Sequence, residues 1–487
     1  MQQFLTTFFV VVYALTILGV ILVIITGNRN PLKTIPWVIV LILAPVVGLV
    51  FYFFFGQDLR KQKIISRRTY KRLMMHPMHD TLRRERGRVP APYVPLSNLL
   101  ININHAEVLP GSRLTPYTDG RSKIEALLRE IDAAKHHIHL QYYIFRDDRT
   151  GCRVQEALIR KAREGVRVRV LYDDVGNSGV KEEFYERMRR EGIEIHAFLH
   201  VKFPMFTSKV NYRNHRKVAV IDGRVGFIGG MNIANRYVDG PGWGVWRDTH
   251  FKVEGKGVYG LQSAFLIDWA ATNKTLLSDP SFYPPAEEYN ASALQVATSG
   301  PFGPWRTLLQ AFTFAIANAK RRIFIQTPYF LPSEGLNTAL QTAALGGIDV
   351  RLMLPERSDS KAVDRAVHSF IDDMVRAGVK VFFYTAGFLH AKLLVIDGTL
   401  TAIGSANMDF RSFEHNFEIN AFVYDEDFAQ RMERIFEDDL KDCKPLVPQQ
   451  WFRRPRRLRL AESFMRMFSP LLLSLIHISE PTRLDVI

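Results

Sequence analysis

The sequence predicts an α/β protein of two repeated domains with pseudo-twofold symmetry, preceded by a transmembrane hairpin of two helices. Three observations predict this architecture. Two long uncharged runs stand at the N-terminus, the remaining chain alternates short β-branched runs with helical patterns, and that alternation occurs twice with matching motifs. Strand–helix–strand alternation is typical of a sheet with parallel strands covered by helices. Self-similarity at similar offsets along the chain indicates an internal duplication.

Composition bounds the function classes. The 487 residues are too many for one ordinary domain, and 47% hydrophobic residues exclude global disorder. The formal net charge of +15 indicates an anionic partner, either nucleic acid or a membrane surface. Two cysteines, Cys152 and Cys443, are too few for a disulfide framework or a cysteine-based zinc site.

The expected hairpin occupies residues 1–56, with helices at about 4–26 and 35–55. Both runs lack charged residues, and only the polar turn GNRNPLKT separates them. A helix over the first run would be roughly 34 Å long, enough to cross a bilayer core. A cleaved signal peptide is disfavoured because no basic residue precedes the run and no small-residue cleavage site follows it.

A basic juxtamembrane segment follows at 57–110. Between Gln57 and Arg88 it carries eleven Lys or Arg against three acidic residues, whereas the turn between the two runs carries only Arg29 and Lys33. Positive charge is retained on the cytoplasmic side of a membrane, so we expect the rest of the protein there. The segment would also lie against anionic headgroups. An anionic membrane is therefore favoured over nucleic acid as the partner.

The repeat defines two domains, at 111–278 and 294–450, joined by a Pro-rich linker at 279–293. Four segments of the first domain have counterparts in the second. These are HIHLQYYIFRDD (137–148) with RIFIQTPYFLPS (322–333), RVRVLYDDVG (167–176) with DVRLMLPERS (349–358), GIEIHAF (192–198) with GVKVFFY (378–384), and NHRKVAVIDGRVGFIGGMN (214–232) with LHAKLLVIDGTLTAIGSAN (389–407).

The last pair of segments carries the candidate chemistry, an H-x-K-x4-D motif in each domain. The motif residues are His215, Lys217, Asp222, His390, Lys392 and Asp397. On a strand, positions i and i+2 share a face, so each imidazole and ammonium should point into one space. A phosphate suits two His and two Lys. The alternative, metal ligation, is disfavoured because an ammonium beside each His repels a cation.

Each motif is followed by a small pair and an asparagine, Gly229-Gly230 before Asn232 and Gly404-Ser405 before Asn407. We expect the small residues to let backbone and Asn amides approach an anion. The two Asp residues are better interpreted as structural, because period two places them on the opposite strand face from His and Lys.

These motifs resemble the twin HKD motifs of the phospholipase D superfamily from about Leu114 to Asp442. The hairpin, the basic segment and the motifs QYYIFRDD, TPYF, GFLHAKLLVIDG and GSANMDFRS resemble bacterial cardiolipin synthases in particular. The resemblance implies two phospholipase D-like domains that condense two phosphatidylglycerols into cardiolipin and glycerol. It also implies an inner-membrane protein with its catalytic domains on the cytoplasmic side, and no cofactor, metal or nucleic acid. Oligomeric state is not implied.

The resemblance assigns roles residue by residue. His215 is the expected nucleophile through a phosphohistidine, and His390 the general acid and then base. Lys217, Lys392, Asn232 and Asn407 would hold the phosphate oxygens. A downstream acidic residue would orient each imidazole, Glu418 that of His390 and Asp248 that of His215. The rival activities are another phosphatidyltransferase such as phosphatidylserine synthase, a lipid hydrolase, a membrane-attached nuclease, or a non-catalytic membrane scaffold.

The C-terminal residues divide into two parts. Residues 451–472 interleave six Arg with Trp, Leu, Met and Phe, which predicts a basic amphipathic segment on the membrane, with a solvated basic tail as the alternative. Residues 473–487 resemble the translation of a transposase sequencing adapter, so we interpret them as a non-native read-through without function.

Overall fold

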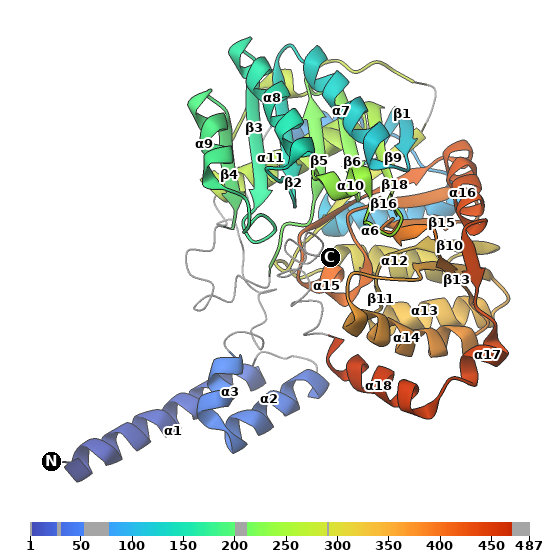
Figure 1. Cartoon of the computed structure of the whole chain (residues 1–487). Coiled ribbons are helices and arrows are strands. Elements are labelled where there is room, and N and C mark those ends of the chain that lie inside the picture. The colour runs from blue at the N-terminus through green and yellow to red at the C-terminus, as the bar shows by residue number, and fades with distance from the viewer. Residues whose placement is uncertain (1, 27–30, 53–76, 200–211, 290–291, 470–487) are drawn as a thin grey trace. The chain divides into compact units, whose positions relative to one another are not determined.

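A computed structural model describes residues 2–26, 31–52, 77–199, 212–289 and 292–469 (Figure 1). The expected read-through, residues 473–487, and most of the basic segment's charges lie outside the described residues. The chain divides into an N-terminal unit, residues 1–61 with 201–210, and a unit formed by the remaining residues.

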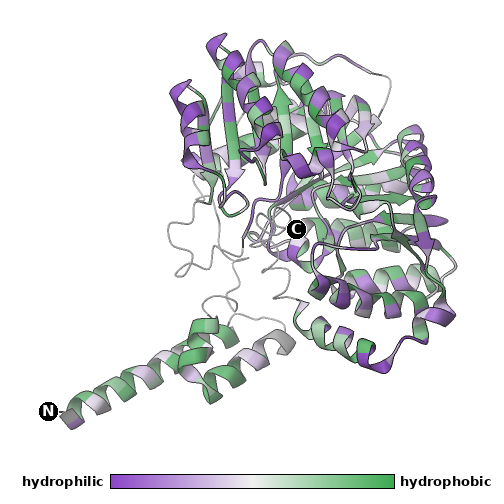
Figure 2. Cartoon of the chain, in the orientation of Figure 1, coloured by the Kyte–Doolittle hydropathy of each residue, from purple (hydrophilic) through white to green (hydrophobic). Residues whose placement is uncertain are grey.

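The N-terminal unit contains three helices, α1 (Gln2–Thr26), α2 (Pro31–Leu43) and α3 (Pro45–Phe51). Among the described residues, one helix is long and apolar enough to cross a membrane, α1 over Gln3–Leu22, and Figure 2 shows its hydrophobic colouring. The expected second helix at 35–55 differs, because it is interrupted at Ala44 (φ −138°, ψ 68°), immediately before Pro45. Proline disfavours the helical conformation of the preceding residue, although Pro36 is accommodated inside α2. Residues 53–55 lie outside the described residues.

The large unit has two stretches of alternating strands and helices. The helices of the first stretch are α5 (Pro77–Arg84), α6 (Val94–Asn104), α7 (Gly120–Ala133), α8 (Arg149–Arg163), α9 (Glu182–Arg190), α10 (Asn235–Asp239) and α11 (Val258–Asn273). Its strands are β1 (Leu109–Tyr117), β2 (His137–Tyr142), β3 (Arg167–Asp173), β4 (Glu194–Phe198), β5 (Lys217–Ile221), β6 (Val225–Gly229), β7 (Val245–Arg247) and β8 (His250–Gly255).

The second stretch follows the same plan. Its helices are α12 (Thr307–Ala317), α13 (Glu334–Leu345), α14 (Lys361–Arg376), α15 (Phe410–Glu414), α16 (Glu426–Leu440), α17 (Pro448–Phe452) and α18 (Arg456–Met467). Its strands are β9 (Ser292–Ser299), β10 (Arg322–Gln326), β11 (Phe330–Leu331), β12 (Asp349–Pro355), β13 (Lys380–Tyr384), β14 (Gly387–Leu389), β15 (Leu393–Ile396), β16 (Leu400–Gly404), β17 (Met408–Asp409), β18 (Glu418–Tyr424) and β19 (Cys443–Pro445). Short 3-10 helices lie at Ala91–Tyr93 and Pro280–Phe282.

One continuous mixed sheet joins the two stretches, in the order β19-β13-β12-β10-β15-β16-β18-β9-β1-β8-β6-β5-β2-β3-β4. The antiparallel pair β1–β9 lies at its centre. Outward from that pair, β8, β6, β5, β2, β3 and β4 on one side correspond in order to β18, β16, β15, β10, β12 and β13 on the other. Each half pairs its three outermost corresponding strands in parallel and its inner strands antiparallel.

Helices cover both faces of the sheet. On one face, apolar residues of α11 and α16, among them Leu261 and Phe436, form a common core with both halves of the sheet. On the other face, α7, α8 and α9 cover the first half, and α12, α13 and α14 cover the second (Figure 1). The expected linker begins with Pro280–Phe282, and the buried Phe282 packs against Trp269 of α11.

Candidate active site

The two histidines lie just before corresponding strands, and each is hydrogen-bonded to the other half of the sheet. His215 stands two residues before β5 and donates its backbone N–H to the carbonyl of Phe417 (2.9 Å). His390 follows β14, which pairs in parallel with β7, and its N–H donates to the carbonyl of Arg247 (2.6 Å). Both side chains are 2% exposed. The backbone therefore holds each motif against the opposite repeat.

Each imidazole is oriented by a carboxylate, but the pairing is the reverse of the expected one. The Nδ1 atom of His215 lies 3.0 Å from both carboxylate oxygens of Glu418. The Nδ1 atom of His390 lies 2.6 Å from Oδ2 of Asp248. The expected partners, Asp248 for His215 and Glu418 for His390, are wrong because a carboxylate that follows a motif in the chain lies on the segment facing the other repeat's histidine.

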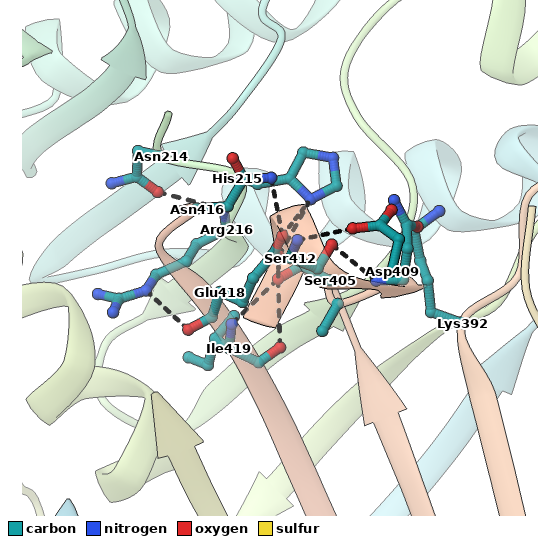
Figure 3. A network of polar contacts seen from close by, with 12 residues as sticks. Asn214, His215, Arg216, Lys392, Ser405, Asp409, Ser412, Asn416, Glu418 and Ile419 are labelled. Atoms are coloured by element: carbon teal, nitrogen blue, oxygen red, sulfur yellow. Dashed lines mark hydrogen bonds and ion pairs between the residues drawn. The ribbon is translucent and has the colours of Figure 1, made fainter. Parts of the chain in front are cut away.

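The small residues after each motif make room for these carboxylates. A Cβ at Gly230 would lie 2.1 Å from Oδ1 of Asp248. At the corresponding place, Ser405 donates its hydroxyl to Glu418 (2.5 Å). Asn416 also donates to Glu418 (3.1 Å), and Figure 3 shows His215, Ser405 and Asn416 around that carboxylate. The small side chains thus meet the orienting carboxylates, where the sequence had suggested approach to an anion.

The two carboxylates differ electrostatically. Burial raises the pKa of Glu418, and this effect exceeds the opposing effects of Lys217 and the donors Ser405 and Asn416. Burial would also raise the pKa of Asp248, but Lys392, His390 and the Thr249 N–H outweigh it and hold that pKa below its ordinary value. Asp248 is therefore the more strongly ionised partner, and an ionised carboxylate favours the imidazolium form of the histidine that it contacts.

Each motif lysine contacts the histidine two residues before it. Lys217 Nζ donates to the backbone carbonyl of His215 (2.6 Å). Lys392 Nζ donates to the carbonyl of His390 (2.5 Å) and lies 3.0 Å from its Nδ1. Both ammonium groups are buried. Burial strengthens the field of these charges at the site and favours an anion there.

The two asparagines differ in what they contact. Asn232 accepts a hydrogen bond from Ile144 N (3.0 Å) and donates one to the hydroxyl of Tyr237 (2.5 Å). Asn407 is 1% exposed, and neither polar atom of its side chain has a hydrogen-bond partner among the described residues. A buried unpaired amide is costly. Asn407 therefore retains the donor that a phosphate oxygen requires, whereas the amide of Asn232 is engaged by the protein.

Asp222 and Asp397 lie away from the imidazoles, at the far ends of β5 and β15. Each occupies a left-handed turn position before glycine, with φ 54° and 56°. Each carboxylate accepts three backbone N–H groups, those of residues 135–137 and 320–322 respectively. The Asp-Gly turn permits positive φ, and the carboxylate fixes the start of β2 or β10. Although both residues belong to the H-x-K-x4-D motif, their contacts are those of the structural role that period two indicated.

Two buried arginines contact the backbone of the carboxylates that orient the histidines. The sequence analysis did not single out either arginine. Arg216 pairs with Asp268 of α11 and donates to the backbone carbonyl of Glu418 (3.1 Å). Arg247 forms a bidentate pair with Asp439 of α16 (2.8 and 2.6 Å) and donates to the carbonyl of Asp248 (2.6 Å). The repeated motif does not indicate a role for Arg216, because the residue between His and Lys is Arg216 in the first copy and Ala391 in the second.

A second group that the sequence did not single out is the buried pair Lys123 and His250. The Lys123 ammonium donates to the Tyr142 hydroxyl (3.0 Å). Burial lowers the pKa of Lys123 to about 7, with a partial opposing effect from Asp248. Burial, with Lys123 and Lys217, also lowers the pKa of His250 well below its ordinary value. The low pKa therefore keeps His250 in its neutral form beside Lys123 and Lys217.

Comparison with known proteins gives consistent matches along the chain. Residues 127–241 and 313–440 match the family described as "Cardiolipin synthase, PLD-like domain". Residues 14–57 match "Phospholipase_D-nuclease N-terminal". The chain is 38% identical over 471 residues to the "Major cardiolipin synthase ClsA" of Bacillus subtilis (strain 168), which covers 94% of this chain and 98% of that protein. It is 40% identical over 470 residues to the "Cardiolipin synthase" of Geobacillus kaustophilus (strain HTA426), covering 95% and 94%.

Among solved structures, the phosphatidylserine synthase of Haemophilus influenzae Rd KW20 matches with a TM-score of 0.58. The match covers 79% of this chain and 99% of that chain at 14% identity. At that identity the likeness establishes a shared fold.

Proposed function

The chain belongs to the cardiolipin synthase family, membrane-associated phosphatidyltransferases with a phospholipase D-like fold, and on this premise we propose a covalent mechanism with His215 as nucleophile. The substrates are two phosphatidylglycerols and the products are cardiolipin and glycerol. The observation that carries the proposal is that each histidine is oriented by a carboxylate of the opposite repeat. One site built by two repeats supplies a nucleophile and a separate proton donor, which in-line phosphoryl transfer requires.

In the first step, neutral His215 attacks the phosphorus of the donor lipid through Nε2. Its Nδ1 is occupied by Glu418, which leaves Nε2 as the reacting nitrogen. The N–P bond forms as the P–O bond to the headgroup glycerol breaks. Protonated His390 gives its proton to the departing glycerol oxygen. The more ionised Asp248 beside His390 and the less ionised Glu418 beside His215 support this division of roles.

In the second step, the headgroup hydroxyl of another phosphatidylglycerol attacks the phosphohistidine. His390, now neutral, takes the proton from that hydroxyl, and the N–P bond breaks as the new P–O bond forms. Cardiolipin leaves, His215 is neutral again and His390 is protonated. Water would give phosphatidic acid instead, so exclusion of water at the lipid surface favours transfer.

Lys217 and Lys392 hold the non-bridging phosphate oxygens in this proposal, together with the Asn407 amide. The unpaired buried amide of Asn407 supports its role. Asn232 instead positions the segment at Ile144. We also infer that the two α/β domains are related by a pseudo-twofold axis at the β1–β9 pair, which the matched strand order on either side supports.

We infer a multi-pass protein of the bacterial inner membrane whose catalytic domains are cytoplasmic. The basic residues after the N-terminal helices support this orientation. A cysteine placed near Lys63 should be labelled only by a reagent with access to the cytoplasm, and one near Asn30 from outside. The opposite labelling pattern would place catalysis on the outer face.

Analysis of lipid products tests the reaction itself. Purified full-length protein in phosphatidylglycerol vesicles should form cardiolipin and glycerol in equal amounts, and an added short alcohol should divert part of the phosphatidyl group to that alcohol. Phosphatidic acid as the main product would identify a hydrolase. Absence of any turnover by correctly folded protein would favour a non-catalytic role.

A further inference from the structure

One face of helix α18 packs against α14 of the large unit. Glu462, which is 2% exposed, pairs with Arg454 (2.7 Å) and lies 3.5 Å from His368 of α14. Arg466 pairs with Asp373 of α14 (3.0 Å). These buried and half-buried contacts determine which face of α18 is directed away from α14.

The opposite face of α18 is apolar and exposed. Leu460, Phe464 and Met467 follow one another at helical spacing and are 70%, 58% and 75% exposed. The ring of Phe468 lies 5.0 Å from that of Phe464 and extends this stripe. Large apolar side chains at positions i, i+4 and i+7 with this exposure are unusual on a surface in contact only with water. Figure 2 shows hydrophobic and hydrophilic residues alternating along the helix.

Positive charge is concentrated at the N-terminal end of the same helix. Arg453, Arg456 and Arg457 form no ion pair with any residue in the described part of the chain, and Arg459 lies 3.7 Å from Asp372. A cavity of about 320 Å³ opens between α14 and α18 beside these arginines. Its lining includes Ser369, Asp372, Arg456, Arg459, Leu460 and Ser463. The acidic groups at this cavity are already paired with Arg454.

We propose that α18 is a membrane-contact helix that binds the anionic bilayer in which the substrate lies. The stripe of Leu460, Phe464 and Met467 enters the boundary between headgroups and acyl chains, and the arginines contact lipid phosphates. A second copy of this chain is a poorer occupant of the stripe, because it would bring a second cluster of unpaired arginines against the first. The helix thereby holds the catalytic unit at the lipid surface independently of the N-terminal helices.

The test uses the full-length protein in lipid nanodiscs, with an environment-sensitive fluorophore on Phe464→Cys. Cys152 and Cys443 are first replaced by Ser in a background whose activity is verified. Leu345→Cys on α13 is the matched control, because Leu345 is apolar and 73% exposed. In discs containing phosphatidylglycerol, the probe at position 464 should be quenched by spin-labelled lipid and shielded from aqueous iodide, whereas the probe at 345 should be quenched by iodide.

Charge dependence separates a lipid partner from a protein partner. Each basic residue near an anionic surface contributes about fivefold to binding. Arg456→Glu with Arg457→Glu should therefore abolish lipid quenching at position 464. The same reversal at the exposed Arg431 and Arg434 of α16 should leave it intact. Shielding from both quenchers would identify a second protein chain as the occupant and overturn the proposal. Full iodide access in phosphatidylglycerol discs, or equal lipid quenching at 345, would also overturn it.

Discussion

The reversed pairing of carboxylates and histidines gives a sharp prediction about Asp248 and Glu418. In the proposed mechanism Asp248 orients the general acid His390, and Glu418 orients the nucleophile His215. Asp248→Asn and Glu418→Gln should therefore both slow turnover, but at different chemical steps. Asp248→Asn should slow protonation of the leaving glycerol. Glu418→Gln should slow formation of the N–P bond whatever the leaving group. Both substitutions nearly preserve side-chain size, remove the negative charge and replace one acceptor oxygen by an amide NH2 donor.

The contact distances set the expected magnitude. Asp248 lies 2.6 Å from His390 Nδ1, and Glu418 lies 3.0 Å from His215 Nδ1. A hydrogen bond to a charged group is worth about 1.5–3 kcal/mol, which corresponds to a rate loss of about 10- to 150-fold. The loss for Asp248→Asn should lie toward the upper end, because Lys392 also loses its ionised neighbour. We expect KM for phosphatidylglycerol to change little in either variant.

The discriminating assay replaces the leaving group. In a phosphatidyl ester of p-nitrophenol, the leaving group is nitrophenolate, which departs without being protonated. The burst of nitrophenolate on mixing therefore reports formation of the N–P bond alone. Asp248→Asn should recover a burst rate close to that of the unmodified enzyme, whereas Glu418→Gln should remain slow. Glu287→Ser, at an exposed acidic residue of the linker, is the control and should leave turnover of both substrates unchanged.

The opposite result would refute this reasoning. If the activated ester rescues Glu418→Gln and leaves Asp248→Asn slow, Glu418 acts with the proton donor and the roles of the two histidines are exchanged. If it rescues neither variant, both carboxylates act before or outside leaving-group departure.

Other predictions concern buried charges. Burial lowers the pKa of Lys123 from 10.5 to about 7, so the unfolded chain binds more protons than the folded chain between these pH values. The free energy of unfolding should therefore rise with pH across that window. Lys123→Met should flatten this rise when thermal denaturation is followed at several pH values, and an unchanged slope would contradict the prediction. Arg247→Lys should lower kcat about tenfold with KM unchanged, because the bidentate pair with Asp439 and the contact to the Asp248 carbonyl are lost. The control Arg113→Lys, at the exposed pair with Glu254, should leave kcat unchanged. Activity should survive chelation, because a lysine beside each histidine repels a cation; loss that stoichiometric zinc restores would indicate ligand histidines.

Sequence patterns predicted those parts of the fold that depend on local regularity. Alternating periodicity and the duplicated motif predicted strands, covering helices and a repeat, and period two predicted that Lys217 and His215 would lie together. Period two also predicted that Asp222 would point away from the imidazoles, although the Asp-Gly turn in which it lies was not predicted. These features are determined by residues within one segment.

The failures share one cause, which is contact between distant segments. The partner of His215 lies 203 residues away, on a segment aligned by the Asn214–Phe417 bridge, and a short bridge has no pattern of its own. Assignment of carboxylates by order in the chain therefore reversed the pairs. The roles of Arg216 and Arg247 were missed for the same reason. Arg216 donates to the backbone carbonyl of Glu418 and Arg247 to that of Asp248, yet the two arginines occupy different positions relative to the motif. The interruption before Pro45 was not predicted, and the prolines of this apolar run do not predict it uniquely, because Pro36 lies inside α2.

Direct mapping of the covalent intermediate tests the central claim. The enzyme is mixed with labelled phosphatidylglycerol, quenched in alkali to preserve phosphohistidine, and digested for mass spectrometry, with His390→Ala used to slow release of the adduct. We predict a phosphatidyl group on the peptide containing His215, in the unmodified enzyme and in the His390→Ala variant, and none in His215→Ala. An adduct on His390 alone, or full cardiolipin synthesis by His215→Ala, would contradict the account.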